Sequence, residues 1–191
     1  PKEFTNRLHP DTEAAFGRQT VLMLSSLKEY KGTREFIELA NRLPQYKFVL
    51  VINDVQENID SFLYKYNIFC SQNLIIYPRQ NNVVPFYNEA SIVINLTDKK
   101  LAVETFGLTA LEAMSAGLPV IVPTEGGIAE MVTDGENGYK IDVQDLNKIV
   151  EYVHLLLSDQ ELYNKLSNNA SAYSRNFNID KMTESILSLF D

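Results

Sequence analysis

The chain has 191 residues, of which 45% are hydrophobic and 22% are charged, and its formal net charge is −8 at pH 7. This length and composition suit one large globular domain with a sizeable core. A general nucleic-acid or anionic-membrane surface needs the opposite charge, so we expect neither as a partner. Any phosphate group must then be held locally, by a few placed donors.

Cys70 is the single cysteine, which excludes an internal disulfide and a cysteine zinc site. It follows Phe69 in an apolar patch, so a buried structural thiol is favoured over a nucleophile. No apolar stretch approaches transmembrane length, and no secretory signal supports the sequons at Asn95 and Asn169. These features favour a soluble protein of the reducing cytoplasm, with membrane contact only through regions outside this sequence.

Residues 1–18 are polar, lack a period and contain Pro10, which predicts a linker or domain edge rather than a folded unit. Across residues 19–191 apolar runs and helical periods alternate, which predicts one domain. The predicted strands are short β-branched runs at 20–25, 48–52, 74–77, 91–95, 119–122 and 139–141. Helical periods lie between them, at 36–43, 59–66, 84–89, 108–116 and 128–132.

Continuous apolar strands predict a sheet covered on both faces. Their alternation with helices predicts right-handed crossovers and a parallel sheet. The expected fold class is therefore α/β, with a doubly wound, Rossmann-like parallel sheet that binds ligands at the carboxyl ends of its strands. After Asp142 the pattern changes to helices alone, with apolar faces at 146–157, 162–173 and 182–190.

The segment from Glu104 to Met114 has the pattern of a ligand site. Glu104 follows the fourth predicted strand, and Gly107 allows the backbone to approach a ligand where the next helix begins. The free N–H groups of that first turn, with the positive end of the helix dipole, favour a phosphate. Glu112 lies roughly 7.5 Å further along the helix axis, within reach of neutral hydroxyls such as those of a ribose. Two glutamates at this spacing also occur by chance, and Glu112 could be a solvated residue, so the prediction depends on the ordered context of strand, glycine and helix.

Two further elements follow predicted strands on the same side of the sheet. Gly126 and Gly127 precede a short helix, where they offer backbone N–H groups to an anion or form a tight turn with positive φ. Lys31 follows the first strand and could neutralise a leaving diphosphate or be an ordinary solvated lysine. The segment 134–138 is most simply a turn before the last strand.

Several motifs are absent from the sequence. There is no G-x-G-x-x-G of a nicotinamide dehydrogenase, no G-x-x-x-x-G-K-[ST] and no Asp-x-Asp that could bridge a metal to a diphosphate. We therefore expect no metal and no bound cofactor. His9 lies in the polar leader, and His154 lies in an amphipathic helix where a structural role is favoured, so no Ser/His/Asp set can be argued.

In these residues the chain resembles the C-terminal domain of family 4 glycosyltransferases, which have the GT-B architecture. The resemblance covers residues 20–190 and is most specific at residues 104–141: the Glu-x7-Glu element, then Gly117-Leu118-Pro119-Val120-Ile121, then Gly126-Gly127 to Glu130. It implies a retaining transfer of a sugar from a nucleotide-sugar donor to an acceptor hydroxyl, as in polysaccharide or glycoconjugate synthesis.

By position, the resemblance implies that Glu104 is catalytic and contacts hydroxyls of the donor sugar. It implies that the segment Thr105-Phe106-Gly107-Leu108 holds the diphosphate through backbone N–H groups. Glu112 would hold the ribose hydroxyls, and Lys31 matches the phosphate-binding lysine of the family. The base is expected at the end of the third strand, around Tyr77 to Arg79.

One position departs from the family pattern, in which many members have an arginine five residues before the lysine. This chain has Ser26 there, so Lys28 or another base supplies the second charge, or the diphosphate binds more weakly. The acceptor domain of the family lies N-terminal to this one, and these 191 residues alone are expected to be inactive. Two alternatives are a nucleotide- or partner-binding module without activity and a sugar-nucleotide epimerase of related shape, whose catalytic acids cannot be placed here.

Overall fold

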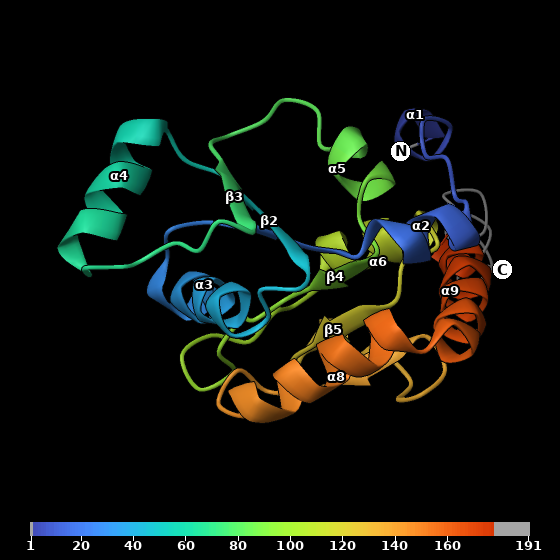
Figure 1. Cartoon of the computed structure of the whole chain (residues 1–191). Helices are drawn as coiled ribbons and strands as arrows, with labels where there is room; N and C mark the ends of the chain where they lie inside the picture. The colour runs from blue at the N-terminus through green and yellow to red at the C-terminus, as the bar shows by residue number, and fades with distance from the viewer. Residues whose placement is uncertain (1, 178–191) are drawn as a thin grey trace, which may run out of the picture.

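A six-stranded parallel sheet forms the centre of the computed structural model, which describes residues 2–177 (Figure 1). The strands lie in the order β3-β2-β1-β4-β5-β6, and every pairing is parallel. They are β1 (Thr20–Ser25), β2 (Lys47–Ile52), β3 (Leu74–Tyr77), β4 (Ile92–Ile94), β5 (Val120–Val122) and β6 (Gly138–Lys140). The predicted α/β class and doubly wound parallel sheet are confirmed.

Helices cover both faces because the chain leaves β1 in two directions, toward β3 and later toward β6, and right-handed crossovers then fall on opposite sides. The helix α3 contacts α8, whereas α2 and α6 contact α9. The long helices are α3 (Thr33–Arg42), α4 (Gln56–Lys65), α6 (Leu108–Ser115), α8 (Leu146–Ser158) and α9 (Gln160–Ser174). The short ones are α1 (Lys2–Thr5), α2 (Thr12–Arg18), η1 (Glu29–Lys31), α5 (Val84–Asn88), α7 (Gly127–Glu130) and η2 (Arg175–Phe177).

The core follows from the apolar periods of the sequence. Phe36, Ile37 and Ala40 recur at helical spacing in α3 and are all fully buried. The ring of Phe36 meets that of Phe48 in β2 edge-on, with 5.4 Å between the centroids. Each buried side chain of this size contributes about 1.5–3 kcal/mol to folding, so this one helix face anchors α3 firmly to the sheet.

The N-terminal segment differs from its prediction as a linker. Residues 12–18 form α2, and Leu8 and Ala15 belong to the hydrophobic core. The carbonyl of Ala15 accepts a hydrogen bond from the buried hydroxyl of Ser91, and the hydroxyl of Thr12 lies 3.0 Å from that of Ser167 in α9. These tertiary contacts order a segment that has no apolar period of its own.

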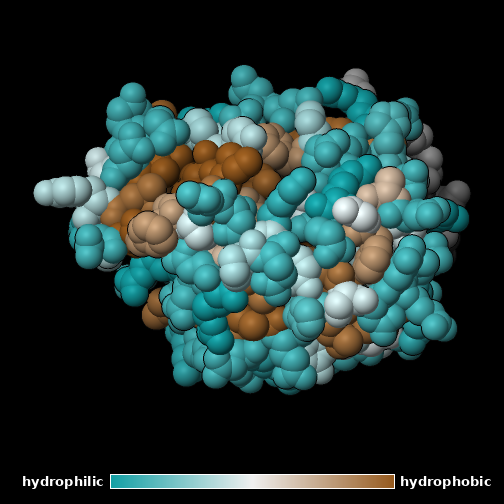
Figure 2. Space-filling model, viewed as in Figure 1, coloured by the Kyte–Doolittle hydropathy of each residue, from teal (hydrophilic) through white to brown (hydrophobic). Residues whose placement is uncertain are grey.

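The sheet is less well covered near its β3 edge. Val49 in β2 and Ile75 in β3 are register partners and share one face of the sheet, and Ile75 is 52% exposed. The crossover helix α5, which returns the chain from β3 to β4, has only five residues. Figure 2 shows apolar surface in this region, where Figure 1 places β3 between α4 and α5.

The carboxyl ends of β1, β4 and β5 lie on one edge of the sheet, because these strands are parallel neighbours. The loops 26–32, 95–107 and 123–126 therefore meet at that edge, where a doubly wound fold binds its ligands. The predicted apolar face at 182–190 lies outside the described residues. Within residues 2–177, no helix is both long and apolar enough to cross a membrane.

Candidate functional site

Lys31 and Glu104 form an ion pair at the carboxyl edge of the sheet. Lys31 ends η1, directly after β1, and its Nζ atom donates to Oε2 of Glu104 at 2.6 Å. The two side chains are 25% and 21% exposed. Two residues that are 73 positions apart in the sequence, and that were predicted to serve one ligand, therefore lie in direct contact.

Thr97 also faces this pair, and the sequence interpretation missed it. Its side chain is almost completely buried, and its hydroxyl donates to Oε2 of Glu104 at 3.4 Å. Its backbone N–H is held by the side-chain oxygen of Asn95. In the sequence, Asn95-Leu96-Thr97 stands out only as a sequon without functional weight. Nothing in the local pattern shows that this loop folds back on Glu104.

Gly107 begins α6 in a left-handed conformation, with φ of 63° and ψ of 47°. A Cβ atom there would also collide with the side chain of Ile128, so this junction requires glycine. Among residues 2–177 no side chain caps α6, and the N–H groups of Leu108 and Thr109 in its first turn remain available to an anion, whereas that of Ala110 is bonded to the carbonyl of Gly107. Phe106 and Leu108 flank the turn and are 49% and 55% exposed.

The paired glycines pack under the segment that carries Glu104. A Cβ atom on Gly126 would meet the carbonyl oxygen of Glu104, and one on Gly127 would meet that of Thr105. Gly126 also has a φ of 96°. Of the two alternatives for this element, close backbone packing with a positive φ is the one that these contacts support, and the element thereby positions Glu104.

Glu112 lies in the middle of α6, where the structure gives it a buried partner. The hydroxyl of Tyr87 in α5 donates to Oε2 of Glu112 at 2.6 Å. Burial raises the pKa of the Glu112 carboxyl, and the hydrogen bond from Tyr87 acts in the opposite direction. Burial, followed by the charge and hydrogen bonding of Glu112, raises the pKa of Tyr87 well above its usual range, so this phenol stays protonated as a donor.

Arg79 lies in the loop after β3, as predicted, but it is exposed and bound to a different loop. Its Nε donates to the side-chain oxygen of Asn53 at 2.8 Å, and its backbone N–H donates to the carbonyl of Asp54. Within residues 2–177, the structure shows no contact that joins Arg79 to Lys31, Glu104 or Glu112.

Lys99 ties together the loops that surround the site. Its ammonium group donates to Oγ1 of Thr124 at 2.7 Å, and it pairs with Glu125 at 2.8 Å and Asp142 at 2.9 Å. The Asp142 carboxylate in turn accepts from the backbone N–H and the hydroxyl of Thr124. The loops after β4, β5 and β6 are joined in this way, which a reading of local patterns could not anticipate.

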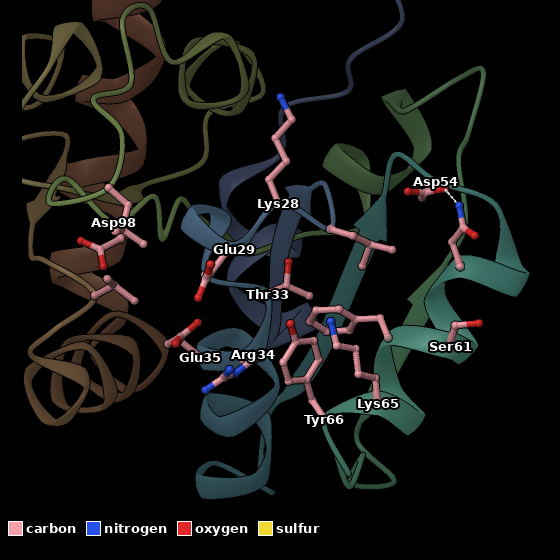
Figure 3. A pocket seen from close by; sticks show the side chains of 16 residues that line it. Lys28, Glu29, Thr33, Arg34, Glu35, Asp54, Ser61, Lys65, Tyr66 and Asp98 are labelled. Carbon is pink, nitrogen blue, oxygen red and sulfur yellow. Dashed lines mark hydrogen bonds between the residues drawn. The ribbon is translucent and has the colours of Figure 1, made fainter.

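A cavity of about 530 Å³ opens between α3 and α4 and adjoins the predicted site (Figure 3). Gly32 and Thr33, next to Lys31, line it together with Tyr66. The guanidinium of Arg34 and the ammonium of Lys65 lie 5.2 Å and 5.0 Å from the centre of the Tyr66 ring. Neither Lys31 nor Glu104 lines this cavity, so it is a neighbour of the site rather than the site itself.

The sequence model of the glycosyl transferases group 1 family matches residues 5–173. The chain belongs to this family. A glycosyltransferase of Haemophilus influenzae described as uncharacterized is 28% identical over 186 residues, which cover 94% of this chain and 51% of that protein. The N-acetyl-alpha-D-glucosaminyl L-malate synthase of Bacillus anthracis is 31% identical over 104 residues, 54% of this chain and 26% of that enzyme. The chain therefore spans about a quarter to a half of the length of these relatives.

Several solved structures share the fold. The C-terminal domain of a glycosyl transferase group 1 family protein from Francisella tularensis has a TM-score of 0.71 at 22% identity, over 91% of this chain and 96% of that one. The Anabaena HepE protein in complex with UDP-glucose has a TM-score of 0.76 at 19% identity, over all of this chain and 52% of that one. The Rossmann-like sheet thus matches the GT-B architecture of glycosyltransferases.

Proposed function

We propose that this glycosyltransferase chain is the C-terminal, donor-binding domain of a retaining family 4 enzyme that moves a sugar from a nucleotide-sugar to an acceptor hydroxyl. One observation carries the proposal. The Lys31 ammonium lies 2.6 Å from the carboxylate of Glu104, and Glu104 lies three residues before Gly107, the glycine that opens α6. The family supplies the reaction class, and this arrangement supplies groups of the right charge for a diphosphate and a sugar.

The leaving diphosphate carries the charge that develops during transfer. In the proposal the Lys31 ammonium and the free N–H groups of the first turn of α6 bind it and stabilise that charge without a metal. Within residues 2–177, no group of three or more His, Cys, Asp or Glu side chains is placed to hold a metal ion.

The two glutamates have separate roles in this proposal. Glu104 accepts hydrogen bonds from the sugar hydroxyls and orients the donor toward the acceptor. Glu112, further along α6, accepts hydrogen bonds from the ribose. A second charge near the diphosphate comes from Lys28, whose ammonium lies 5.8 Å from the centre of the Tyr30 ring that Lys31 also approaches.

The comparisons support a nucleotide-sugar donor and a second domain. The Anabaena relative is described in complex with UDP-glucose, and the Francisella structure is described as a C-terminal domain. The present chain covers about half of the Haemophilus relative. In the proposal an N-terminal α/β domain outside these residues binds the acceptor, and the reaction takes place in the cytoplasm.

Calorimetric titration of UDP, GDP and ADP into the chain, with EDTA present, tests donor binding. We expect one of the three to bind at millimolar concentration or below, with amide NMR shifts centred on Gly107 and Glu112. Glu112→Ala should weaken that binding, whereas Glu136→Ala, in the exposed turn before β6, should leave it unchanged. Absence of binding by all three nucleotides at millimolar concentration would refute the proposal.

Product analysis with the full-length enzyme tests the stereochemistry. The anomeric configuration of the transferred sugar in the product, measured by NMR, should match that of the donor. An inverted product would exclude the retaining mechanism while leaving the donor-site assignment intact.

A further inference from the structure

Tyr87 is buried between α5 and α6, and its hydroxyl is aimed at the second glutamate of the site. The side chain is 1% exposed, and its ring packs edge-on against Phe4 with 5.7 Å between the centroids. The hydroxyl lies 2.6 Å from Oε2 of Glu112 and 3.4 Å from the carbonyl of Thr109. A phenol has one hydrogen to donate, and the shorter contact to a carboxylate is the stronger bond.

The hydrogen bond from Tyr87 occupies one of the two oxygens of the Glu112 carboxylate, Oε2. A carboxylate has two oxygens that can each accept, and in residues 2–177 the hydrogen bond shown for this group is the one from Tyr87 to Oε2. A ligand that bound this carboxylate without breaking the bond to Tyr87 would use the other oxygen, Oε1. The phenol is itself fixed by burial, so it restricts a glutamate that would otherwise sample several rotamers along α6.

The same contact keeps Glu112 an acceptor. Burial disfavours the charged carboxylate, and the Tyr87 hydroxyl counteracts burial by hydrogen-bonding to the charged form. A protonated carboxyl would lose acceptor capacity toward ribose hydroxyls.

We infer that Tyr87 is a positioning residue that holds Oε2 of Glu112 so that Oε1 recognises the ribose hydroxyls, which makes the site selective for ribonucleotide over deoxyribonucleotide donors. The inference rests on the proposed function, because it requires that Glu112 binds ribose. It assigns the selectivity to the pair, with Glu112 in contact with the ligand and Tyr87 behind it.

Paired titrations of each ribonucleotide and its 2′-deoxy counterpart (UDP and dUDP, GDP and dGDP, ADP and dADP) test this inference. For the nucleotide that binds, we expect the wild-type chain to prefer the ribose form about tenfold, as one well-made hydrogen bond to a charged group allows. Tyr87→Phe should reduce this preference to less than about threefold, through weaker ribonucleotide binding, with deoxynucleotide binding unchanged.

Tyr163→Phe is the matched control. Tyr163 is also fully buried and its hydroxyl also makes one bond, to the carbonyl of Ser91, but it lies between α9 and the sheet. This variant should keep the full ribose preference. If the preference survives in Tyr87→Phe and is lost in Glu112→Ala, the inference about Tyr87 is wrong and the ribose role of Glu112 stands.

The two proposals fail in different ways. No nucleotide binding, or a wild-type preference that Glu112→Ala leaves intact, contradicts the proposed function itself. If Tyr87→Phe does not fold, NMR of the wild-type hydroxyl proton decides the question. The proton should remain protected and hydrogen-bonded when UDP, GDP or ADP is bound, and its loss on binding would show that Glu112 leaves Tyr87 to reach the ligand, which overturns the inference.

Discussion

The Nζ atom of Lys31 lies 2.6 Å from Oε2 of Glu104. With a nucleotide-sugar bound, the diphosphate would compete with Glu104 for the same ammonium group. Transfer of Lys31 from Glu104 to the phosphates would release the carboxylate for the sugar hydroxyls. In the proposed function the ion pair would therefore link recognition of the diphosphate to recognition of the sugar, and the two residues should respond differently to substitution.

Lys31→Met should weaken nucleoside diphosphate binding by about tenfold or more, because charge-assisted bonds to phosphate contribute about 1.5–3 kcal/mol each. Binding of the uncharged nucleoside should change little. Calorimetry with UDP and uridine, or the matching pair for the base that binds, measures both. Lys47→Met, at the start of β2 and the opposite edge of the sheet, is the control. Equal losses for the diphosphate and the nucleoside would contradict the phosphate role.

Glu104→Gln in the full-length enzyme should reduce kcat far more than it weakens nucleotide binding, because in the proposed function the sugar rather than the nucleotide contacts Glu104. A loss of about 100-fold in kcat is expected if the group stabilises the transition state. Steady-state kinetics and a separate nucleotide titration provide the two numbers. Parallel losses in kcat and affinity would mean that Glu104 serves the diphosphate instead.

The paired glycines Gly126 and Gly127 give a prediction about stability that has an internal control. Gly127→Ala places a Cβ against the carbonyl of Thr105 and should lower the free energy of unfolding by about 1–3 kcal/mol. Gly17→Ala, in α2 with open space around it, should raise it by up to about 1 kcal/mol through helix propensity. Urea unfolding of both variants measures the two effects. An unchanged free energy of unfolding in Gly127→Ala would show that the backbone at residues 104–105 can move away from the added Cβ atom.

The sheet and the strand-to-helix junction at Gly107 could be predicted from the sequence because their causes are local. β-branched runs such as 48–52 specify buried strands, and a glycine before a helical period specifies the left-handed turn that opens α6. The family resemblance predicted roles for the two glutamates and for Lys31, and the structure shows that Lys31 contacts Glu104.

The partners of these residues could not be predicted, because they depend on how distant loops approach one another. Thr97, Tyr87 and Lys99 have no local signature, and each reaches the site only after the parallel sheet has aligned its strand ends. The helix α2 escaped prediction for the same reason, since it is ordered through Ser91 and Ser167 rather than by its own apolar pattern.

The Lys99 cluster should make stability depend on acidic pH. Burial tends to raise the pKa of Asp142, but hydrogen bonds from Thr124 and Lys99 outweigh it and hold that pKa below its usual range. Because the folded pKa is below the unfolded one, this stabilisation is present above the unfolded pKa and is lost as pH falls through the folded pKa. Asp142→Asn should therefore flatten the loss of stability at acidic pH, as measured by urea unfolding across that range. If Asp142→Asn loses stability at acidic pH as steeply as the wild-type protein, Asp142 is not the source of that loss.

Glu112 should show the opposite linkage between pH and stability. Burial raises the pKa of its carboxyl, so the folded chain holds this proton to a higher pH than the unfolded chain does. The free energy of unfolding then falls as pH rises from the unfolded pKa through the folded pKa, and the loss persists above both. Glu112→Gln removes this effect and should be the more stable protein at neutral pH while binding nucleotide less well.

Urea unfolding of the wild-type and Glu112→Gln proteins between pH 4 and pH 8 measures the effect on stability. Titrations with UDP and dUDP, or the matching pair for the base that binds, are made at the same pH values. The deoxynucleotide corrects for protonation of the phosphate itself, so a fall in the ribose preference at low pH reports on the carboxyl alone. Identical pH slopes in the two proteins would show that folding does not raise the pKa of Glu112, and would contradict this prediction.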